Sequence, residues 1–438
     1  MYIRRLIDKH LLDWANAKSR KPLLLRGARQ VGKSSSVRHL AESFENFVEI
    51  NFEKQKAAVS AFEGDLIPTE ICNKLSVIYR QPIVAGKTLL FLDEIQACPN
   101  AISSLRFFYE DYPQQHIIAA GSLLEFALAK VNSFGVGRIT NLFMYPFSFS
   151  EFMLACGYAE LNEKIRKHSP QNPIFEAFHA KIIEILRTFL LIGGMPEAVV
   201  KYVETQSIYE AQNVLSDLIV TLKSDFEKYR EKIPLLRLNM VFDGVVNQAG
   251  QRVVYSNLSR DYKIGQIKEC VELLRMAGLV VPVIHTAANG IPLGAESNLK
   301  KQKLMLLDTG VYLKLSGLDM TDIITGTNLE MINKGKVAEM FAALELQKSL
   351  PVNSGSLLYF WHRESKNSSA EVDFLIQQGD KIVPIEIKSG ISGKMQSLHL
   401  FLKEKNSECG IRCSLENFAH YDNIDVYPLY AISNIVNQ

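Results

Sequence analysis

Two stretches of the sequence carry polar residues at spacings that suit phosphate and metal chemistry. The first follows an apolar run at residues 22–25 and has the pattern Gly-x-x-x-x-Gly-Lys-Ser. Glycines let such a loop turn its backbone N–H groups toward phosphate oxygens, and the helix that follows points its positive end at them. We expect Lys33 to reach the β- and γ-phosphates of ATP and Ser34 to ligate Mg²⁺. The predicted nucleotide-binding residues are Gly27, Ala28, Arg29, Gln30, Val31, Gly32, Lys33, Ser34 and Ser35.

An acidic motif downstream supplies the second metal partner that a phosphate-binding loop needs. The apolar run at residues 88–92 ends in Asp93 and Glu94. Asp93 is placed to hold Mg²⁺ at the end of a buried strand, and Glu94 is placed to polarise the attacking water as a general base. The two motifs together predict Mg²⁺-dependent hydrolysis of ATP.

Two more polar residues accompany other predicted strands. Ser122 follows the apolar residues 116–120 and could sense the γ-phosphate or orient water, or equally cap the next helix. Arg138 precedes a strand at residues 139–143 and could stabilise charge on the transferred phosphoryl group, in cis or toward a neighbouring subunit of a homo-oligomer. An ordinary surface arginine is the alternative. A strand at residues 47–52, between the motifs, favours the additional-strand, catalytic-glutamate branch of P-loop ATPases.

The second set of residues with a spacing suited to chemistry lies near the end of the chain. Residues 370–376 and 383–388 predict a hairpin that brings Asp373 and Glu386 to one end of a sheet, with Lys388 on the same face as Glu386. Two carboxylates that hold Mg²⁺ or Mn²⁺ and a lysine that positions water suffice for phosphodiester cleavage. Glu339 on a preceding helix could add a third metal-binding carboxylate. A solvated hairpin is the alternative interpretation.

The elements that must position these residues change along the chain. Strands alternate with helices up to residue 150, which predicts an α/β fold with a parallel sheet wrapped by helices. Residues 151–235 indicate helices with a break at residues 193–196, which is either a helix end with a rigid turn or a nucleotide-gated hinge.

A pair of helices in residues 236–290, followed by an apolar strand, has the order of a winged helix, whose second helix could enter a major groove. Protein binding or plain packing is the alternative role for such a module. The polar side chains offered by this second helix are Lys263, Gln266, Lys268 and Arg275.

Composition bounds the class of protein. A chain of 438 residues with 47% hydrophobic and 22% charged residues excludes disorder and a single small binding module. The formal net charge of +2 neither demands nor excludes DNA as a partner, so any basic site must be local. No apolar run approaches the ~20 residues that cross a bilayer, and the first residues lack a signal-peptide pattern. We therefore expect a cytoplasmic protein, not a membrane protein, with six reduced cysteines.

Taken together, the motifs resemble those of bacterial and archaeal AAA-type ATPases that carry a C-terminal domain of unknown function with a restriction-endonuclease-like, PD-(D/E)xK, fold. The resemblance implies ATP binding and slow ATP hydrolysis. It rests on segments in family order at residues 27–34, 92–96, 120–122, 137–138, 145–152, 193–198, 371–374 and 384–388.

The predicted organisation is a P-loop ATPase core (1–150), a helical lid (151–235), a winged-helix-like domain (236–290) and a restriction-endonuclease-like α/β domain (291–438). The predicted function is an ATPase whose nucleotide cycle controls a nuclease-like module that acts on nucleic acid, with DNA as the candidate partner. The alternative is a signalling or scaffold ATPase whose C-terminal domain binds a protein partner without cleaving nucleic acid.

Overall fold

The chain divides into two compact units in a computed structural model. The first consists of Met1–Tyr145, Met276–Gly278 and Val352–Gly355, and the second of Pro146–Arg275, Leu279–Pro351 and Ser356–Gln438. The residues that the structure describes are 2–121, 137–229, 232–317, 335–353, 355, 357–364, 370–390 and 395–436.

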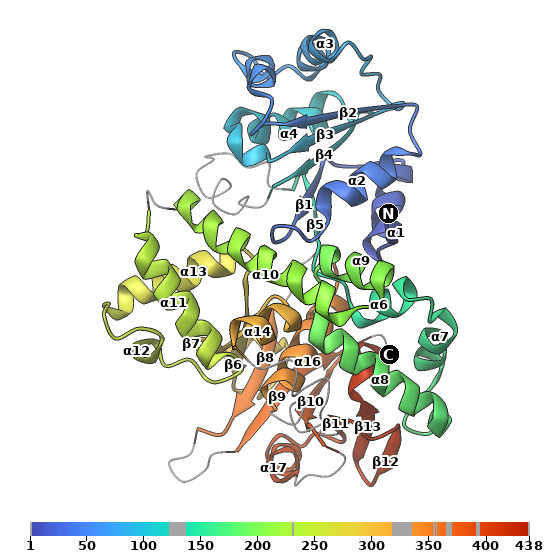
Figure 1. The fold of residues 1–438 in the computed structure, drawn as a ribbon, viewed down its shortest axis with the longest axis vertical. Helices are drawn as coiled ribbons and strands as arrows, with labels where there is room; N and C mark the ends of the chain where they lie inside the picture. The colour runs from blue at the N-terminus through green and yellow to red at the C-terminus, as the bar shows by residue number, and fades with distance from the viewer. Residues whose placement is uncertain are drawn as a thin grey trace. The chain divides into compact units, whose positions relative to one another are not determined.

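The first unit is built on a parallel sheet flanked by helices (Figure 1). The spatial order of its strands is β2 (Asn46–Asn51), β3 (Thr88–Asp93), β4 (His116–Ala120), β1 (Leu23–Arg26) and β5 (Thr140–Phe143). All neighbouring pairs in this sheet are parallel. The helices are α1 (Ile7–Asn16), α2 (Lys33–Ala41), α3 (Pro68–Tyr79) and α4 (Pro99–Asp111). The predicted α/β fold with a parallel sheet is confirmed for this part of the chain.

Strand β3 holds the acidic motif in a fixed place because it is buried along its whole length. Leu90 and Leu92 pack in one hydrophobic core with Ile102, Leu105 and Phe108 of α4. A parallel strand covered on both faces needs a continuous apolar run, and the sequence of β3 provides one. Burial at ~25 cal/mol per Å² of apolar surface fixes the strand and therefore the carboxyl end at which Asp93 lies.

The order of strands brings the polar strand ends to one edge of the sheet. Strand β2 lies between the two motifs in sequence but at the edge of the sheet in space, whereas β4 separates β1 from β3. The carboxyl ends of parallel strands meet at one edge, where α/β proteins bind ligands. Asn51 and Asp93 therefore lie at the same edge as the loop that follows β1.

The second unit begins with helices, as the sequence predicted for residues 151–235. They include α6 (Phe149–Ala155), α7 (Ala159–Lys167), α8 (Glu176–Ile192), α9 (Pro196–Thr205) and α10 (Ile208–Ser224). The pair of helices predicted beyond residue 235 is also present, as α11 (Leu235–Gln248) and α13 (Ile264–Met276), and the short, unpredicted α12 (Tyr255–Leu258) lies between them. Two further helices, α14 (Thr309–Leu315) and α16 (Lys336–Ser349), follow.

The break between α8 and α9 is a packed turn. The carboxylate of Asp308, which also caps α14, accepts a hydrogen bond from the Gly194 N–H at 2.6 Å. A Cβ on Gly194 would lie 2.2 Å from the carbonyl oxygen of Phe147, and Gly193 has a positive φ of 70°. This tight packing favours the rigid turn over the nucleotide-gated hinge.

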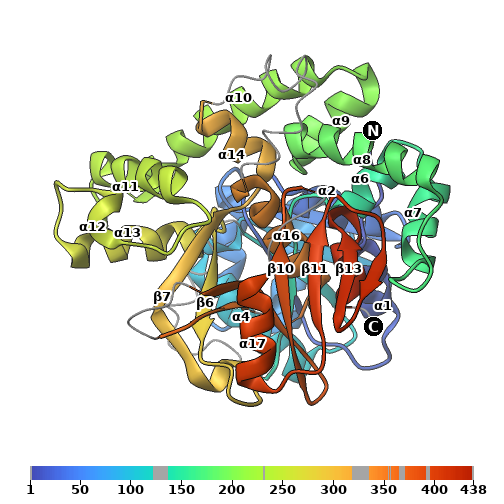
Figure 2. The same ribbon diagram turned by 90° about the horizontal axis from the view of Figure 1, so that it is seen from below.

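A mixed sheet forms the rest of the second unit (Figure 2). Helix α16 packs against β7, β8 and β10, and α17 (Gln396–Lys405) packs against β9, β10 and β11. The spatial order of the strands is β12 (Ala419–Tyr421), β13 (Ile424–Pro428), β11 (Gly410–Ser414), β10 (Lys381–Ile387), β9 (Glu371–Gln378), β8 (Leu358–His362), β6 (Val280–Thr286) and β7 (Ser297–Leu306). The predicted hairpin is confirmed, because β9 and β10 pair in antiparallel fashion.

The winged-helix-like segment shares this sheet. Strands β6 and β7 pair as an antiparallel hairpin after α13, and β6 also pairs in parallel with β8. The predicted boundary between residues 290 and 291 therefore falls inside a hairpin. Among the described residues, no helix is long and apolar enough to cross a bilayer.

Candidate functional site

The loop between β1 and α2 has the backbone conformation of a phosphate cradle. Gly27, Gln30 and Gly32 have positive φ angles of 145°, 60° and 97°. A Cβ on Gly27 would lie 2.2 Å from the carbonyl oxygen of Met144, so only glycine fits there. The loop leads into the first turn of α2, whose free N–H groups favour an anion.

Lys33 is buried against this loop. Its Nζ donates hydrogen bonds to the carbonyl oxygens of Gly27 at 2.9 Å and Ala28 at 2.7 Å. Burial lowers the pKa of Lys33 to about 8, against the opposing effect of Glu94 and Asp93. A phosphate bound in the loop would therefore lie next to the Lys33 ammonium group, which is shielded from solvent.

Ser34 and Asp93 lie side by side, as a magnesium site requires. The Ser34 hydroxyl donates to Oδ2 of Asp93 at 3.0 Å, and the Asn51 amide donates to the same oxygen at 3.3 Å. Burial and the neighbouring Glu94 raise the pKa of Asp93. Mg²⁺ prefers oxygen ligands, and the Ser34 hydroxyl and the buried Asp93 carboxylate supply two of them side by side. These residues therefore fit the predicted ion.

Glu94 stands at the turn that follows β3. Its backbone has a positive φ of 50°, and its N–H donates to Oδ1 of Asp93 at 3.1 Å. The Gln96 amide donates to Oε2 of Glu94 at 2.5 Å. The turn thus holds the Glu94 carboxylate next to Asp93 and orients it through Gln96.

Arg5, which lies outside the motif and was not predicted to matter, contacts the phosphate-binding loop. The buried Arg5 donates to the carbonyl oxygens of Val31 at 3.0 Å and Tyr145 at 2.8 Å. Nearby, the Tyr2 hydroxyl donates to Asp8 at 2.6 Å and lies 3.0 Å from the Ser36 hydroxyl. The segment before α1 is therefore tied to the end of the phosphate-binding loop, to the first turn of α2 and to the residues that follow β5.

The remaining predicted residues of the first unit are not part of this arrangement. Arg138 precedes β5, at the sheet edge opposite the phosphate-binding loop, and forms an ion pair with Glu110 at the end of α4. The length of β5 thus lies between Arg138 and the strand ends that carry the site. The action of Arg138, in cis or in trans, stays a prediction. Ser122 lies outside the described residues.

A second polar cluster lies in the sheet of the second unit. Asp373 on β9 accepts a hydrogen bond from the Ile387 N–H at 2.9 Å, and this bond holds it beside the end of β10. The Lys388 ammonium donates to Oε1 of Glu386 at 2.6 Å, while the buried Oε2 of Glu386 has no hydrogen-bond partner among the described residues. These are the residues that the hairpin was predicted to bring together.

A lysine from β7 lies inside this cluster. The Lys303 side chain is 2% exposed, and its Nζ lies 3.4 Å from Glu339, 3.4 Å from Asp373 and 2.7 Å from Glu371. These carboxylates raise the pKa of Lys303 despite its burial. Lys303 thus acts as a cation within the group of carboxylates that was predicted to bind metal.

Carboxylates still outnumber ammonium groups in the cluster. Burial, followed by the charge of Asp373, raises the pKa of Glu339 to about 8 and that of Glu386 to about 7. The unpartnered oxygen of Glu386 and the excess of carboxylates fit an added divalent cation with oxygen ligands.

The predicted groove-reading helix, α13, presents a nearly neutral surface. The Arg275 guanidinium pairs with Glu272 at 2.6 Å, and the Lys268 ammonium lies 5.1 Å from the centre of the Tyr255 ring. The Gln266 side chain accepts from the Lys263 N–H at 3.2 Å and so serves the start of the helix. These contacts occupy most of the polar side chains that were predicted to contact DNA.

Comparison with known protein families assigns the first unit. Residues 19–153 match the AAA domain family. The first unit is an AAA-type P-loop ATPase domain. Residues 183–322 and 334–432 match two families described as domains of unknown function, DUF8612 and DUF4143. A search of the curated proteins finds no match to this sequence.

Solved structures give distant likenesses. The Walker-type ATPase PABY2304 of Pyrococcus abyssi is 17% identical with a TM-score of 0.45, over 72% of this chain and 96% of its own. The ORC1 protein of Aeropyrum pernix, solved in complex with DNA, is 13% identical with a TM-score of 0.27, over 71% and 90%. A signal transduction ATPase with a tetratricopeptide repeat sensor from Pyrococcus horikoshii is 11% identical with a TM-score of 0.25, over 80% and 46%.

Proposed function

We propose that the chain is a Mg²⁺-dependent ATP hydrolase whose nucleotide cycle controls a nuclease-like C-terminal module that acts on nucleic acid. The observation that carries the first half is the Ser34–Asp93 contact at 3.0 Å beside the buried Lys33. The second half is supported by the cluster of Glu339, Asp373, Glu386 and Lys388 in the second unit.

The residues of the first unit divide the work of phosphoryl transfer. The N–H groups of the loop and Lys33 bind the phosphates, Ser34 and Asp93 would hold Mg²⁺, and Glu94 takes a proton from the attacking water. The ion supplies charge stabilisation to the phosphate oxygens when bound. Asn51 orients Asp93, and Gln96 orients Glu94.

Two variants test the ATPase half. Lys33→Ala should abolish ATP binding, because it removes the ammonium group that is buried against the loop. Glu94→Gln should still bind ATP but hydrolyse it at least about 100-fold more slowly, as expected for loss of a general base. Fluorescent-nucleotide binding and phosphate release measure the two steps. A rate of ATP hydrolysis by Glu94→Gln equal to that of the wild type would contradict the assignment of Glu94 as the general base.

The nuclease half is tested on DNA. Linear, circular and single-stranded DNA are incubated with the full chain and Mn²⁺, with and without ATP. Cleavage by the wild type and its loss in Asp373→Ala would support the proposal. Asp425→Asn is the matched control, because Asp425 lies in the same sheet but pairs with His420 away from the cluster.

A second candidate function is favoured by Lys303. Because its ammonium already lies among Glu339, Glu371 and Asp373, the cluster has a cation without any metal. An ATPase switch whose C-terminal unit binds a protein partner needs no more than this stable fold. Absence of both cleavage and salt-sensitive DNA binding in the same experiment would favour this alternative.

A further inference from the structure

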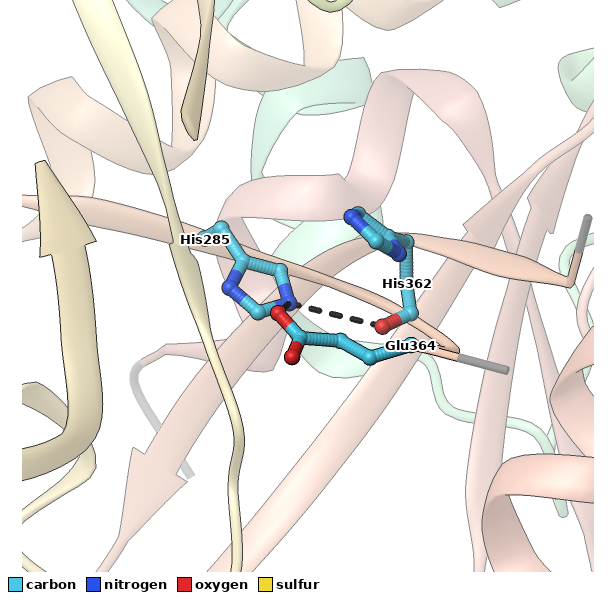
Figure 3. Close-up of side chains that lie close together, drawn as sticks. All are labelled: His285, His362 and Glu364. Atoms are coloured by element: carbon cyan, nitrogen blue, oxygen red, sulfur yellow. Dashed lines mark hydrogen bonds and ion pairs between the residues drawn. The ribbon is translucent and has the colours of Figure 1, made fainter. Parts of the chain in front are cut away.

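A third group of side chains of metal-binding types lies in the same sheet as the carboxylate cluster, where His362 of β8 pairs with Glu371 of β9. One ligand atom from each of His285, His362 and Glu364 lies within 4.8 Å of the other two (Figure 3). His285 is on β6, and His362 ends the neighbouring parallel strand β8, so backbone pairing places the two histidines together. Their ring centroids are 4.7 Å apart.

The buried histidine lacks adequate hydrogen-bond partners. His285 is 2% exposed, and its Nδ1 has no partner among the described residues. Its Nε2 lies 3.4 Å from the His362 carbonyl oxygen and 4.0 Å from Oε1 of Glu364. A buried imidazole with one long hydrogen bond is costly. Its Nε2, the nitrogen nearer to Glu364 in Figure 3, is the atom that a bound ion would contact.

His362 is oriented as a ligand would be. Its Nδ1 lies 3.0 Å from the Arg363 carbonyl oxygen, which can accept a hydrogen bond from that nitrogen. Metal-binding histidines commonly donate one ring N–H to a carbonyl in this way, which leaves the lone pair of the other nitrogen free. Burial lowers the pKa of His285, which favours the neutral ring that can bind an ion.

The third ligand is exposed and already attracts a cation. The Glu364 side chain is 58% exposed and forms an ion pair with Lys301 of β7. A tetrahedral zinc site places its ligand atoms about 3.3 Å apart. The exposed Glu364 side chain can rotate to bring its carboxylate to this distance from the histidine nitrogens. In doing so it breaks its ion pair with Lys301 and binds the metal ion instead.

We propose that His285, His362 and Glu364 bind a divalent first-row transition metal, with Zn²⁺ as the best match. Two imidazoles and one carboxylate are nitrogen-rich ligands that suit Zn²⁺, whereas the carboxylate cluster around Asp373 suits Mg²⁺ or Mn²⁺. Three protein ligands leave a fourth position for water or a phosphate oxygen. Lys301 competes with the ion for Glu364, so the ammonium of Lys301 opposes metal binding.

Metal binding by the full, metal-stripped chain tests this site. Co²⁺ is titrated in excess Mg²⁺, which occupies the oxygen-ligand sites, and the visible absorption of tetrahedral Co²⁺ is followed; Zn²⁺ should then displace it. We expect one equivalent to bind. Absence of binding in the wild type would overturn the proposal.

Ligand variants locate the ion. Glu364→Gln and His362→Asn should each weaken Zn²⁺ binding by roughly 100-fold or more, since loss of an outer-shell partner alone costs 10–100-fold. His285→Asn should weaken Zn²⁺ binding to a similar extent. If this substitution of a buried residue prevents folding, the Glu364→Gln variant, at an exposed position, still tests the site. Unchanged affinity in Glu364→Gln and His362→Asn would overturn the assignment.

Three further variants test the competition by Lys301 and separate this site from other residues that could bind the ion. Lys301→Gln should strengthen Zn²⁺ binding several-fold, because it removes the competing ammonium; a weaker affinity would contradict the proposed competition. Cys409→Ser and His420→Asn alter an exposed thiol and an exposed imidazole elsewhere and should leave the affinity unchanged. Loss of binding in either control would place the ion at that residue instead.

Discussion

Arg5 shows how a residue outside the motif can set the shape of the phosphate-binding loop. Its guanidinium joins the carbonyl oxygen of Val31, inside the loop, to that of Tyr145, beyond the end of β5. Arginine can hold two acceptors because its donors form a rigid planar fork. The loop carbonyl that Arg5 fixes adjoins Gly32, which must keep its positive φ for Lys33 to start α2.

Replacing Arg5 should therefore weaken nucleotide binding without touching the nucleotide. Arg5→Met removes two charge-assisted hydrogen bonds, each worth ~1.5–3 kcal/mol when buried. We expect the KM for ATP to rise at least about 10-fold, with a smaller change in kcat. Arg4→Met is the matched control, because Arg4 is the exposed neighbour. Equal kinetics in Arg5→Met and wild type would show that the loop keeps its shape without this contact.

The tight joint between α8 and α14 shows, at the scale of elements, what anchors the helical part of the second unit. Gly194 lies against the Phe147 carbonyl and donates to Asp308, and Asp308 in turn caps α14 through the Val311 N–H at 3.0 Å. A larger side chain at Gly194 must push apart two segments of backbone. Gly194→Ala should therefore destabilise the second unit by about 2–4 kcal/mol, as overpacking and lost buried hydrogen bonds do.

Tryptophan fluorescence during urea unfolding measures this loss in the second unit alone. The chain has two tryptophans, so Trp14→Phe leaves Trp361 of β8 as the sole reporter. Gly265→Ala is the control, since a Cβ on Gly265 meets no atom within 4 Å. Equal urea midpoints for Gly194→Ala and Gly265→Ala would indicate that the turn at Gly194 adjusts to a larger side chain, as a hinge would.

The carboxylate cluster makes the stability of the second unit depend on pH. The pKa of Glu339 is raised from 4.5 to about 8 in the folded chain, chiefly by burial. A carboxyl whose folded pKa is raised stabilises the fold below its unfolded pKa, and that stability is lost as the pH rises through the folded pKa. The free energy of unfolding should thus fall between pH 4.5 and about 8.

Glu339→Gln should flatten this dependence. The Trp361 reporter, followed at pH 5.5 and 8.5, should show a loss of about 1–3 kcal/mol in the unsubstituted chain on going to the higher pH, and a clearly smaller loss in Glu339→Gln. Mn²⁺ at the higher pH should restore stability to the chain that keeps Glu339. A pH dependence identical in both chains would show that Glu339 ionises freely.

Sequence patterns predicted those parts of the sites that are local or lie on adjacent strands. Lys33 and Ser34 belong to one loop, and a buried strand end places Asp93 beside them. Asp373 and Glu386 belong to one hairpin. Asn51 could also have been found, because it ends a strand parallel to β3.

The residues that sequence reasoning missed lie far from the motifs along the chain. Lys303 reaches Asp373 from β7, and two other strands separate β7 from β9 in the sheet. No local spacing reports such an approach. The only signal was a lysine beside the apolar run at residues 304–307. His285 and His362 meet for a similar reason, because β6 pairs with a strand that follows it after more than seventy residues.

The whole molecule combines an ATPase domain with a unit that holds a separate cluster of carboxylates, and the proposed function requires the first to influence the second. Hydrogen exchange can measure this influence directly. In Glu94→Gln with ATP and Mg²⁺, the trapped nucleotide should protect the amides of the loop at residues 27–34. If the nucleotide cycle controls the second unit, protection should also change in α16, β9 and β10, where Glu339, Asp373 and Glu386 lie.

The comparison with Lys33→Ala assigns any change to the nucleotide, because that variant should not bind ATP. A change in α16, β9 and β10 that appears in Glu94→Gln and is absent from Lys33→Ala would establish communication between the units. Coupling between two ligands is reciprocal, so DNA bound to the second unit should change the affinity for ATP by the same factor by which ATP changes the affinity for DNA. Protection confined to the first unit would separate ATP hydrolysis from the second unit and contradict the proposed control.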